Sequence, residues 1–261
     1  MSEIVQHQIS RAFDHGKAFI AFLTVGDPST TKTAEYVEAL VAGGADLIEL
    51  GIPFSDPIAE GPVIQEADQR ALDAGTDLDA VFSLAADVNR RVNVPLVFLT
   101  YLNPVFHTGY VRFFDRCKTA GISGVIIPDL PFEEQGELLP IAQARGVDVV
   151  TLVAPTSADR IARIAEASRG FVYAVSSMGV TGVRSQITTD IGAMVAAIKQ
   201  HTDTPVAVGF GISTLEQARA MAAVSDGVIV GSAIVKIIAD HPDDAAPYLR
   251  AYAKSMKDAM T

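Results

Sequence analysis

Leu47-Ile48-Glu49-Leu50-Gly51-Ile52 is a short apolar run that a single carboxylate interrupts. Apolar side chains at consecutive positions are typical of a parallel strand that is buried on both faces. Similar runs recur from one end of the chain to the other. They predict eight strands, at Phe19–Val25, Leu47–Ile52, Leu96–Tyr101, Gly124–Pro128, Val147–Val153, Phe171–Val175, Val206–Phe210 and Val228–Val230.

The segments between these runs have the features of helices. Thr30–Ala42 carries apolar residues at helical spacing and ends at a Gly43-Gly44 pair, and Asp77–Arg91 begins acidic and ends basic, as the helix dipole favours. Ser213 and Glu216 have capping-box spacing at the start of a further helix. The other predicted helices are Ser157–Ser168, Thr214–Val224, His241–Met260 and an extra N-terminal helix, Ser2–Phe13, that would plug the bottom of a barrel.

Strands that alternate with helices over the whole chain indicate a parallel sheet. Eight such units favour a single (β/α)8 TIM barrel, which typically needs about 250 residues, and the chain has 261. Hydrophobic residues make up 49% of the sequence, which is enough for a sizeable core. We found no linker or low-complexity tract, so we expect one domain over residues 1–261.

The overall charge and the cysteine count limit the classes of partner. The net charge is −11 without any basic run, which argues against nucleic acid and anionic membranes as partners. A phosphorylated small molecule stays possible, because backbone N–H groups bind phosphate without a basic surface. Cys117 is the only cysteine, and no apolar run is long enough to cross a bilayer. We therefore expect a cytoplasmic protein.

Glu49 is the first candidate for chemistry, because barrel enzymes carry their reactive groups at the carboxyl ends of the strands. Burial of a carboxylate raises its pKa towards neutrality, as a general acid or base requires. A purely structural carboxylate held by backbone donors is the alternative. The loop 53–62 follows and contains Asp56 and Glu60, which are either chemical groups or ordinary turn residues.

Two glycine-bearing turns, Gly209–Ser213 and Val230–Ala233, follow strands seven and eight. This is the recurrent phosphate site of TIM barrels, although tight barrel geometry alone would also place glycines there. The stretch Ser176–Gly182 after strand six has the small residues of a mobile lid, or of an ordinary loop.

Several kinds of catalysis lack support in the sequence. The five histidines are scattered singly, without metal-ligand spacing, and no lysine lies within a predicted strand. We therefore expect neither a metal nor a Schiff-base mechanism. Cys117 is interpreted as a packed helix residue. Carboxylate acid–base catalysis on a phosphorylated substrate remains.

With these features in view, the sequence resembles the tryptophan synthase α-subunit family. The resemblance is carried by long motifs in the family's order: residues 47–57, Gly61-Pro62-Val63-Ile64-Gln65, Tyr101-Leu102-Asn103-Pro104, Pro128-Asp129-Leu130-Pro131, Gly179-Val180-Thr181-Gly182, Gly209-Phe210-Gly211-Ile212-Ser213 and Gly231-Ser232-Ala233-Ile234-Val235. It implies a lyase that splits indole-3-glycerol phosphate into indole and glyceraldehyde 3-phosphate by a retro-aldol reaction, without a cofactor in this subunit.

The resemblance also implies roles for individual residues. Glu49 would shuttle a proton between the glycerol hydroxyl and indole C3, and Glu60 would hold the proton of the indole nitrogen. The remaining implied contacts are an indole slot of Phe22, Leu99, Ile126 and Tyr173, a lid residue, Thr181, that closes onto residue 60, and a phosphate site of Gly182, Phe210, Gly211, Gly231 and Ser232.

One residue departs from the family's pattern, which has Asp where this chain has Glu60. The implied partner is a pyridoxal-phosphate β subunit in an α2β2 heterotetramer, bound through the loop 53–62, Asn103–Phe106 and Pro131–Glu134. Three alternatives stay open. The chain could be another phosphate-binding barrel such as an isomerase, a stand-alone indole-releasing lyase, or a weakly catalytic subunit that mainly activates its partner.

Overall fold

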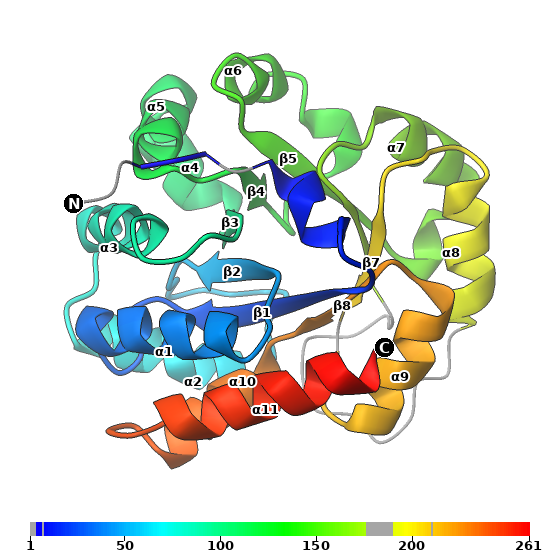
Figure 1. Ribbon diagram of the computed structural model, residues 1–261. Helices are drawn as coiled ribbons and strands as arrows, with labels where there is room; N and C mark the ends of the chain where they lie inside the picture. Colours follow the sequence, from blue (N-terminus) through cyan, green and yellow to red (C-terminus); the bar gives the residue numbers. More distant parts are fainter. Residues whose placement is uncertain (1–3, 7, 176–189, 210) are drawn as a thin grey trace.

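The computed structural model describes residues 4–6, 8–175, 190–209 and 211–261. Eight parallel strands close into a barrel in the order of the sequence, and helices surround it (Figure 1). All eight predicted strands are confirmed, with ends that differ by a few residues. They are β1 Ala18–Thr24, β2 Leu47–Gly51, β3 Leu96–Leu99, β4 Gly124–Ile126, β5 Asp148–Val153, β6 Val172–Val175, β7 Val206–Gly209 and β8 Gly227–Val230.

The helices lie between the strands along the chain, as the alternating pattern predicts. The α-helices of the described residues are α1 Thr30–Ala42, α2 Pro62–Asp73, α3 Leu78–Asn89, α4 Leu102–Thr108, α5 Tyr110–Ala120, α6 Leu139–Gln143, α7 Ile161–Ala167, α8 Ile191–Lys199, α9 Leu215–Val224, α10 Ser232–Asp240 and α11 Ala246–Ala259. Three short 3-10 helices, η1 Ile9–Phe13, η2 Phe132–Glu134 and η3 Pro155–Arg160, complete the set.

Side chains at the helix starts explain several of these boundaries. Ser29 accepts a hydrogen bond from the backbone N–H of Lys32 at the start of α1, and Asp77 accepts from that of Ala80 at the start of α3. The capping box of α9 was predicted one residue too early. It joins Thr214 to Gln217 rather than Ser213 to Glu216.

The predicted helix Ser2–Phe13 is wrong over its described N-terminal part. Residues 4–6 and 8 are not helical, and only the short η1 follows. The backbone N–H and C=O of Val5 bond to the side chain of Asn89, each at 2.8 Å. The side chain of Gln6 donates to the carbonyl oxygens of Ile122 and Gly146, both at 2.9 Å. These bonds to distant parts of the chain replace the bonds that a helix would make within itself.

The predicted plug at the bottom of the barrel is confirmed, and Ile9 supplies it. The Ile9 side chain is 1% exposed and belongs to the cluster of apolar residues inside the barrel. A Cβ on Gly124 would come within 2.7 Å of Ile9 Cδ1, and one on Gly170 within 2.8 Å. The two glycines thus leave the space that this side chain occupies.

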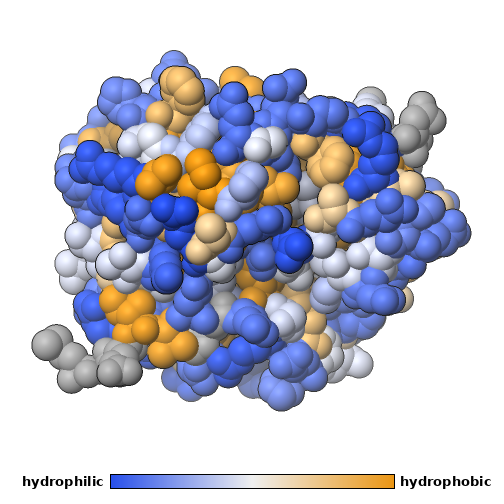
Figure 2. Space-filling model, turned by 90° about the horizontal axis from the view of Figure 1, so that it is seen from above, coloured by the Kyte–Doolittle hydropathy of each residue, from blue (hydrophilic) through white to orange (hydrophobic). Residues whose placement is uncertain are grey.

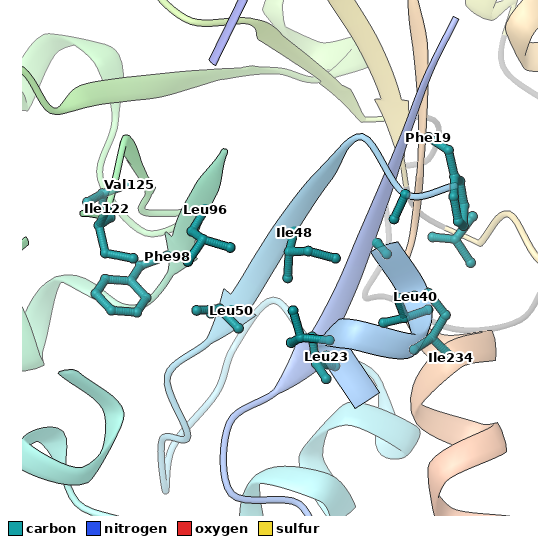
Figure 3. Close-up of a cluster of buried hydrophobic side chains, with 14 of the residues drawn as sticks. Phe19, Leu23, Leu40, Ile48, Leu50, Leu96, Phe98, Ile122, Val125 and Ile234 are labelled. Atoms are coloured by element: carbon teal, nitrogen blue, oxygen red, sulfur yellow. The ribbon is translucent and has the colours of Figure 1, made fainter. Parts of the chain in front are cut away.

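Alternation along each strand separates an inner and an outer core. In β2, Ile48 and Leu50 point outward and belong to the large cluster between the strands and the helices, whereas Leu47 belongs to the cluster inside the barrel. Figure 3 shows outer-core side chains of β1 to β4 together with Leu40 of α1 and Ile234 of α10. Glu49 is therefore on the inner side of β2.

The C-terminal helix α11 packs along α1 and helps to hold the closing strand β1. Lys257 Nζ donates to Asp46 Oδ2 and to the carbonyl oxygen of Lys17, each at 2.7 Å. The ladder between β1 and β8 starts at the pair Ala18 and Gly227 and closes the barrel.

The face of the molecule in Figure 2 is largely hydrophilic, with separate hydrophobic patches. Within the described ranges, each helix is either too short or too polar to cross a membrane.

Candidate active site

One pocket collects most of the residues that the sequence marks for the indole slot. Phe22, Leu99, Ile126 and Tyr173 line it together with Glu49 and Glu60. The register of the parallel strands brings these side chains together, because Phe22 pairs with Glu49 and Leu99 pairs with Ile126 across neighbouring strands. The pocket lies at the carboxyl ends of the strands, where barrel enzymes hold their reactive groups.

Glu49 is 1% exposed and stands among apolar walls. Its Oε1 has no hydrogen-bond partner in the described part of the chain. Burial raises the pKa of Glu49 from 4.5 to about 8. The carboxyl is thus mostly protonated at neutral pH and can change its charge close to that pH.

Glu60 comes from the loop after β2 and reaches the same pocket, 4% exposed. The carbonyl oxygen of Glu60 accepts from Gln65 Nε2 at 2.8 Å, which ties the end of the loop to the first turn of α2. Burial raises the pKa of Glu60 to about 7, against the lowering effect of backbone N–H donors and with a smaller raising effect from Asp129. At neutral pH this carboxyl is close to half ionised.

Two aromatic walls of the pocket rest on glycines. A Cβ on Gly51 would come within 2.7 Å of the Phe22 ring, and one on Gly231 within 3.1 Å of it. A Cβ on Gly209 would come within 2.4 Å of the Tyr173 hydroxyl oxygen. At Gly51 and Gly209 a ring fills the space where a side chain would begin, and at Gly231 a Cβ would press on the Phe22 ring.

The expected phosphate end is described in part. Gly211, Gly231 and Ser232 all line the pocket. Gly211 has a φ of +84°, a conformation that favours glycine, and Gly231 caps α10, whose first residue is Ser232. The start of α10 therefore directs backbone N–H groups towards this end of the pocket. Gly182 and Phe210, which are also expected here, lie outside the described residues, as does the whole predicted lid, Ser176–Gly182, with Thr181.

Other pocket residues were not singled out from the sequence. They are Ala59, Ile64, Pro128, Leu152, Ile212 and Ile229. The signal for one of them was present. Leu152 pairs with Tyr173, so the register of the strands places it on the same inner face.

The cysteine and the possible metal ligands, which the sequence analysis excluded from the chemistry, can be examined in the structure. Cys117 is fully buried in α5, and burial raises the pKa of its thiol. No cluster of His, Cys, Asp and Glu that could hold a metal ion occurs in the described residues.

Comparison with known proteins agrees with this geometry. The family model described as "Tryptophan synthase alpha chain" matches residues 10–261. The chain belongs to that family. The tryptophan synthase alpha chain of Lacticaseibacillus casei is 46% identical over 98% of this chain and 97% of its own length.

Solved structures of the tryptophan synthase family share the barrel. A tryptophan synthase structure from Mycobacterium tuberculosis has a TM-score of 0.87 at 36% identity, covering 97% of each chain. A structure on mutual activation of the tryptophan synthase a2b2 complex from Pyrococcus furiosus has a TM-score of 0.86 at 36% identity. It covers 93% of this chain and 98% of its own.

The loop 53–62 is fastened to Tyr101, which lies between β3 and α4. The rings of Phe54 and Tyr101 stack with centroids 5.1 Å apart, and the backbone N–H of Ala59 donates to the Tyr101 hydroxyl at 2.8 Å. Ile58 in the same loop is 72% exposed, and Phe106 in α4 is 68% exposed. Two large apolar side chains thus face solvent on segments that follow neighbouring strands.

Proposed function

We propose that Glu49 and Glu60 carry out the reaction of this lyase of tryptophan biosynthesis, the cleavage of indole-3-glycerol phosphate to indole and glyceraldehyde 3-phosphate. The observation that carries the proposal is the place of Glu49. A carboxyl with a pKa of about 8 stands in an apolar slot at the carboxyl ends of the strands. Such a group changes protonation near neutral pH, as a proton shuttle requires.

Cleavage breaks the bond between indole C3 and the adjoining carbon of the glycerol chain. The hydroxyl on that carbon loses its proton and becomes the aldehyde carbonyl, while C3 keeps the bonding electron pair and gains a proton. Glu49 serves both steps in turn as acid and as base. Because the surrounding slot is apolar, little water competes for the proton.

Glu60 is assigned to the indole nitrogen. Protonation at C3 places positive charge on the ring system, and an ionised carboxylate at the N–H stabilises that charge. The pKa of about 7 makes ionised Glu60 available at neutral pH while Glu49 remains mostly protonated. The two carboxyls thus hold different charges at one pH, as their different roles require.

The rest of the pocket orients the substrate. Phe22, Leu99, Ile126 and Tyr173 form an apolar slot suited to indole. The far end, with Gly211, Gly231 and Ser232, is assigned to the phosphate, together with Gly182 and Phe210 by family membership. Thr181 keeps its assignment to the lid that closes onto residue 60. Replacing Gly211 with Val should raise the KM for indole-3-glycerol phosphate. The φ of +84° at this position disfavours a branched side chain, and the added bulk keeps the phosphate away from the backbone. Unchanged KM would place the phosphate elsewhere.

A tryptophan synthase β subunit is the proposed partner, in an α2β2 assembly, with pyridoxal phosphate held by the β subunit alone. The exposed Ile58 and Phe106 support a protein interface on this side of the barrel. Binding there would act on the loop 53–62 and so on Glu60. The single buried cysteine agrees with a reducing, cytoplasmic location.

Glu60 also supports a second candidate function, a weakly catalytic subunit that mainly activates its partner. Its side chain is one methylene longer than the aspartate of the family's motif, and a misplacement of ~1 Å can cost ~10²-fold in rate.

Indole release by the chain alone, and again with its cognate β subunit, tests both candidates. The chain has no Trp, so protein tryptophan adds nothing to the indole fluorescence in the first arm. We expect measurable cleavage that the β subunit increases, and a loss of at least ~10²-fold in Glu49→Gln with substrate binding retained. Near-normal turnover of Glu49→Gln would refute the shuttle. Negligible cleavage in both arms, with activation of the β subunit, would favour the second candidate.

A further inference from the structure

The turn 211–213, which follows β7, is held by two side chains that lie outside the substrate pocket. Gly211 and Ile212 line the pocket, whereas Ser213 does not. Both backbone polar groups of Ser213 are bound by side chains of helices. Gln217 Oε1, in α9, accepts from the N–H of Ser213 at 2.9 Å, and the hydroxyl of Tyr252, in α11, donates to the carbonyl oxygen of Ser213 at 3.0 Å. The end of the turn is therefore fixed between two helices.

The core of the protein determines where the Tyr252 hydroxyl lies. Helix α11 packs against α9 and α10, the helices that follow the two glycine-bearing turns (Figure 1). Leu249, Ala253 and Met256 of α11 are fully buried. Tyr252 is within one helical turn of all three, and its ring packs against the outer core. The ring is thus anchored independently of the pocket, and its hydroxyl can serve as a fixed point for the turn.

The Tyr252 hydroxyl remains a donor throughout the neutral range. Burial raises the pKa of this hydroxyl above its ordinary value of 10. The group therefore keeps its proton, and a neutral phenol donates readily to a carbonyl oxygen.

The turn needs such an external restraint because it contains glycine. Gly211 has a φ of +84°, and a glycine has more conformational freedom to lose than any other residue. Backbone groups that hold a ligand must stay within a narrow range of positions. The two bonds at Ser213 restrict the turn two residues beyond Gly211.

We infer that Tyr252 is a positioning residue for the phosphate of the substrate, because its hydroxyl fixes the turn 211–213 at the phosphate end of the pocket. The inference rests on the proposed assignment of that end to the phosphate. The bond that breaks adjoins the indole ring, where Glu49 acts, and not the phosphate. Loss of the Tyr252 hydroxyl should therefore weaken substrate binding and leave the chemical step intact.

Tyr36 offers a matched control in the same protein. Its hydroxyl donates to the carbonyl oxygen of Pro242 at 2.7 Å, and its side chain is fully buried in α1. Neither Tyr36 nor Pro242 lines the pocket. Tyr36→Phe thus removes the same kind of bond without affecting the turn. A general loosening of the barrel would appear in both variants, whereas a change at the turn would appear only in Tyr252→Phe.

The first test is a titration of the full chain with inorganic phosphate, followed by the amide NMR signals of Gly211 and Ser232. The dissociation constant for phosphate should rise ~5-fold in Tyr252→Phe, the factor that one ordinary hydrogen bond represents. Water can satisfy the freed carbonyl oxygen in this variant, but it does not tie the turn to α11. Tyr36→Phe should bind phosphate like the parent. Equal affinity of parent and Tyr252→Phe would overturn the inference, and so would equal weakening in both variants.

Indole release gives a second readout that packing alone would not move. In Tyr252→Phe the KM for indole-3-glycerol phosphate should rise ~5-fold while kcat stays within about twofold of the parent, as for a contact that is equally strong before and during cleavage. A lower kcat with an unchanged KM would overturn the inference.

The two readouts separate the inference from the proposed function. If the parent releases no indole, the proposed reaction fails, and the phosphate titration still decides the role of Tyr252. If the parent binds no phosphate near Gly211 and Ser232, the inference fails, and indole release still decides the reaction.

Discussion

Replacing Glu49 with glutamine changes the pH dependence of stability by an amount that the burial of the carboxyl sets. The pKa of Glu49 is about 8 in the folded chain against 4.5 for a free side chain. Because the folded pKa is the higher one, the unfolded chain loses its proton first as the pH rises. The contribution of Glu49 to stability is therefore complete below pH 4.5 and declines from there to pH 8.

For each pH unit in this window, the free energy of unfolding of the parent falls by about 1.4 kcal/mol relative to that of a variant whose residue 49 does not titrate. As the pH rises from 5 to 8, the free energy of unfolding of the parent should therefore fall by up to about 4 kcal/mol relative to that of Glu49→Gln. The difference is smaller if water enters the slot of the folded chain. The unpaired amide of glutamine lowers the stability of the variant by about 1–3 kcal/mol, but equally at every pH.

Urea unfolding followed by circular dichroism at pH 5, 6, 7 and 8 measures the difference. Glu60 and Asp68 also titrate in this range, but they are present in both proteins, so their effects largely cancel. Asp73 is exposed, and the free energy of unfolding of the control variant Asp73→Asn should follow that of the parent at all four pH values. A constant difference between Glu49→Gln and the parent would mean that the fold does not hold Glu49 neutral, and the argument for a proton shuttle would lose its physical basis.

Substitutions at three further positions test other parts of the structure. Glu60→Asp should equal or exceed the parent rate of indole release. Glu60→Gln should fall at least ~10²-fold below it, the low end for a group that stabilises developing charge. Equal rates for parent and Glu60→Gln would make Glu60 a bystander. Gly51→Ala places a Cβ 2.7 Å from the Phe22 ring, so the ring must move and KM for indole-3-glycerol phosphate should rise; an unchanged KM would show that the ring does not shape the slot. Asn89→Ala removes the two bonds to the backbone of Val5 and should lower the free energy of unfolding by about 1–3 kcal/mol. An unaltered urea midpoint would count against that anchor.

The strands and several helices were predictable because local patterns determine them. Helix α1 begins and ends where predicted, since Ser29 caps its start and a glycine pair follows its end. The α9 cap was misplaced by one residue because Ser213-Thr214 and Glu216-Gln217 offer two caps with the same spacing. The sequence contains both, and only the folded backbone selects between them.

The parts that sequence reasoning missed depend on contacts between distant segments. Nothing near Val5 indicates that Asn89 will take its backbone hydrogen bonds, so a helix seemed the natural structure there. Asp68 looks like a solvated residue of an amphipathic helix, and its burial follows from the packing of α2 against β1 and α10. Among the pocket residues, Glu49 was recognisable because a charge within an apolar strand is unusual.

Because β1 pairs with β8, the barrel cannot close during synthesis until almost the whole chain has left the ribosome. Strand β1 emerges early, but the N–H and C=O groups on one of its edges have no partner until Gly227–Val230 have been made. An unpaired edge of this kind is a template for the wrong strand, from this chain or from another. Helix α11, which bonds to Asp46 and to the backbone before β1, emerges later still. The nascent barrel therefore stays open between β1 and β8 for most of its translation.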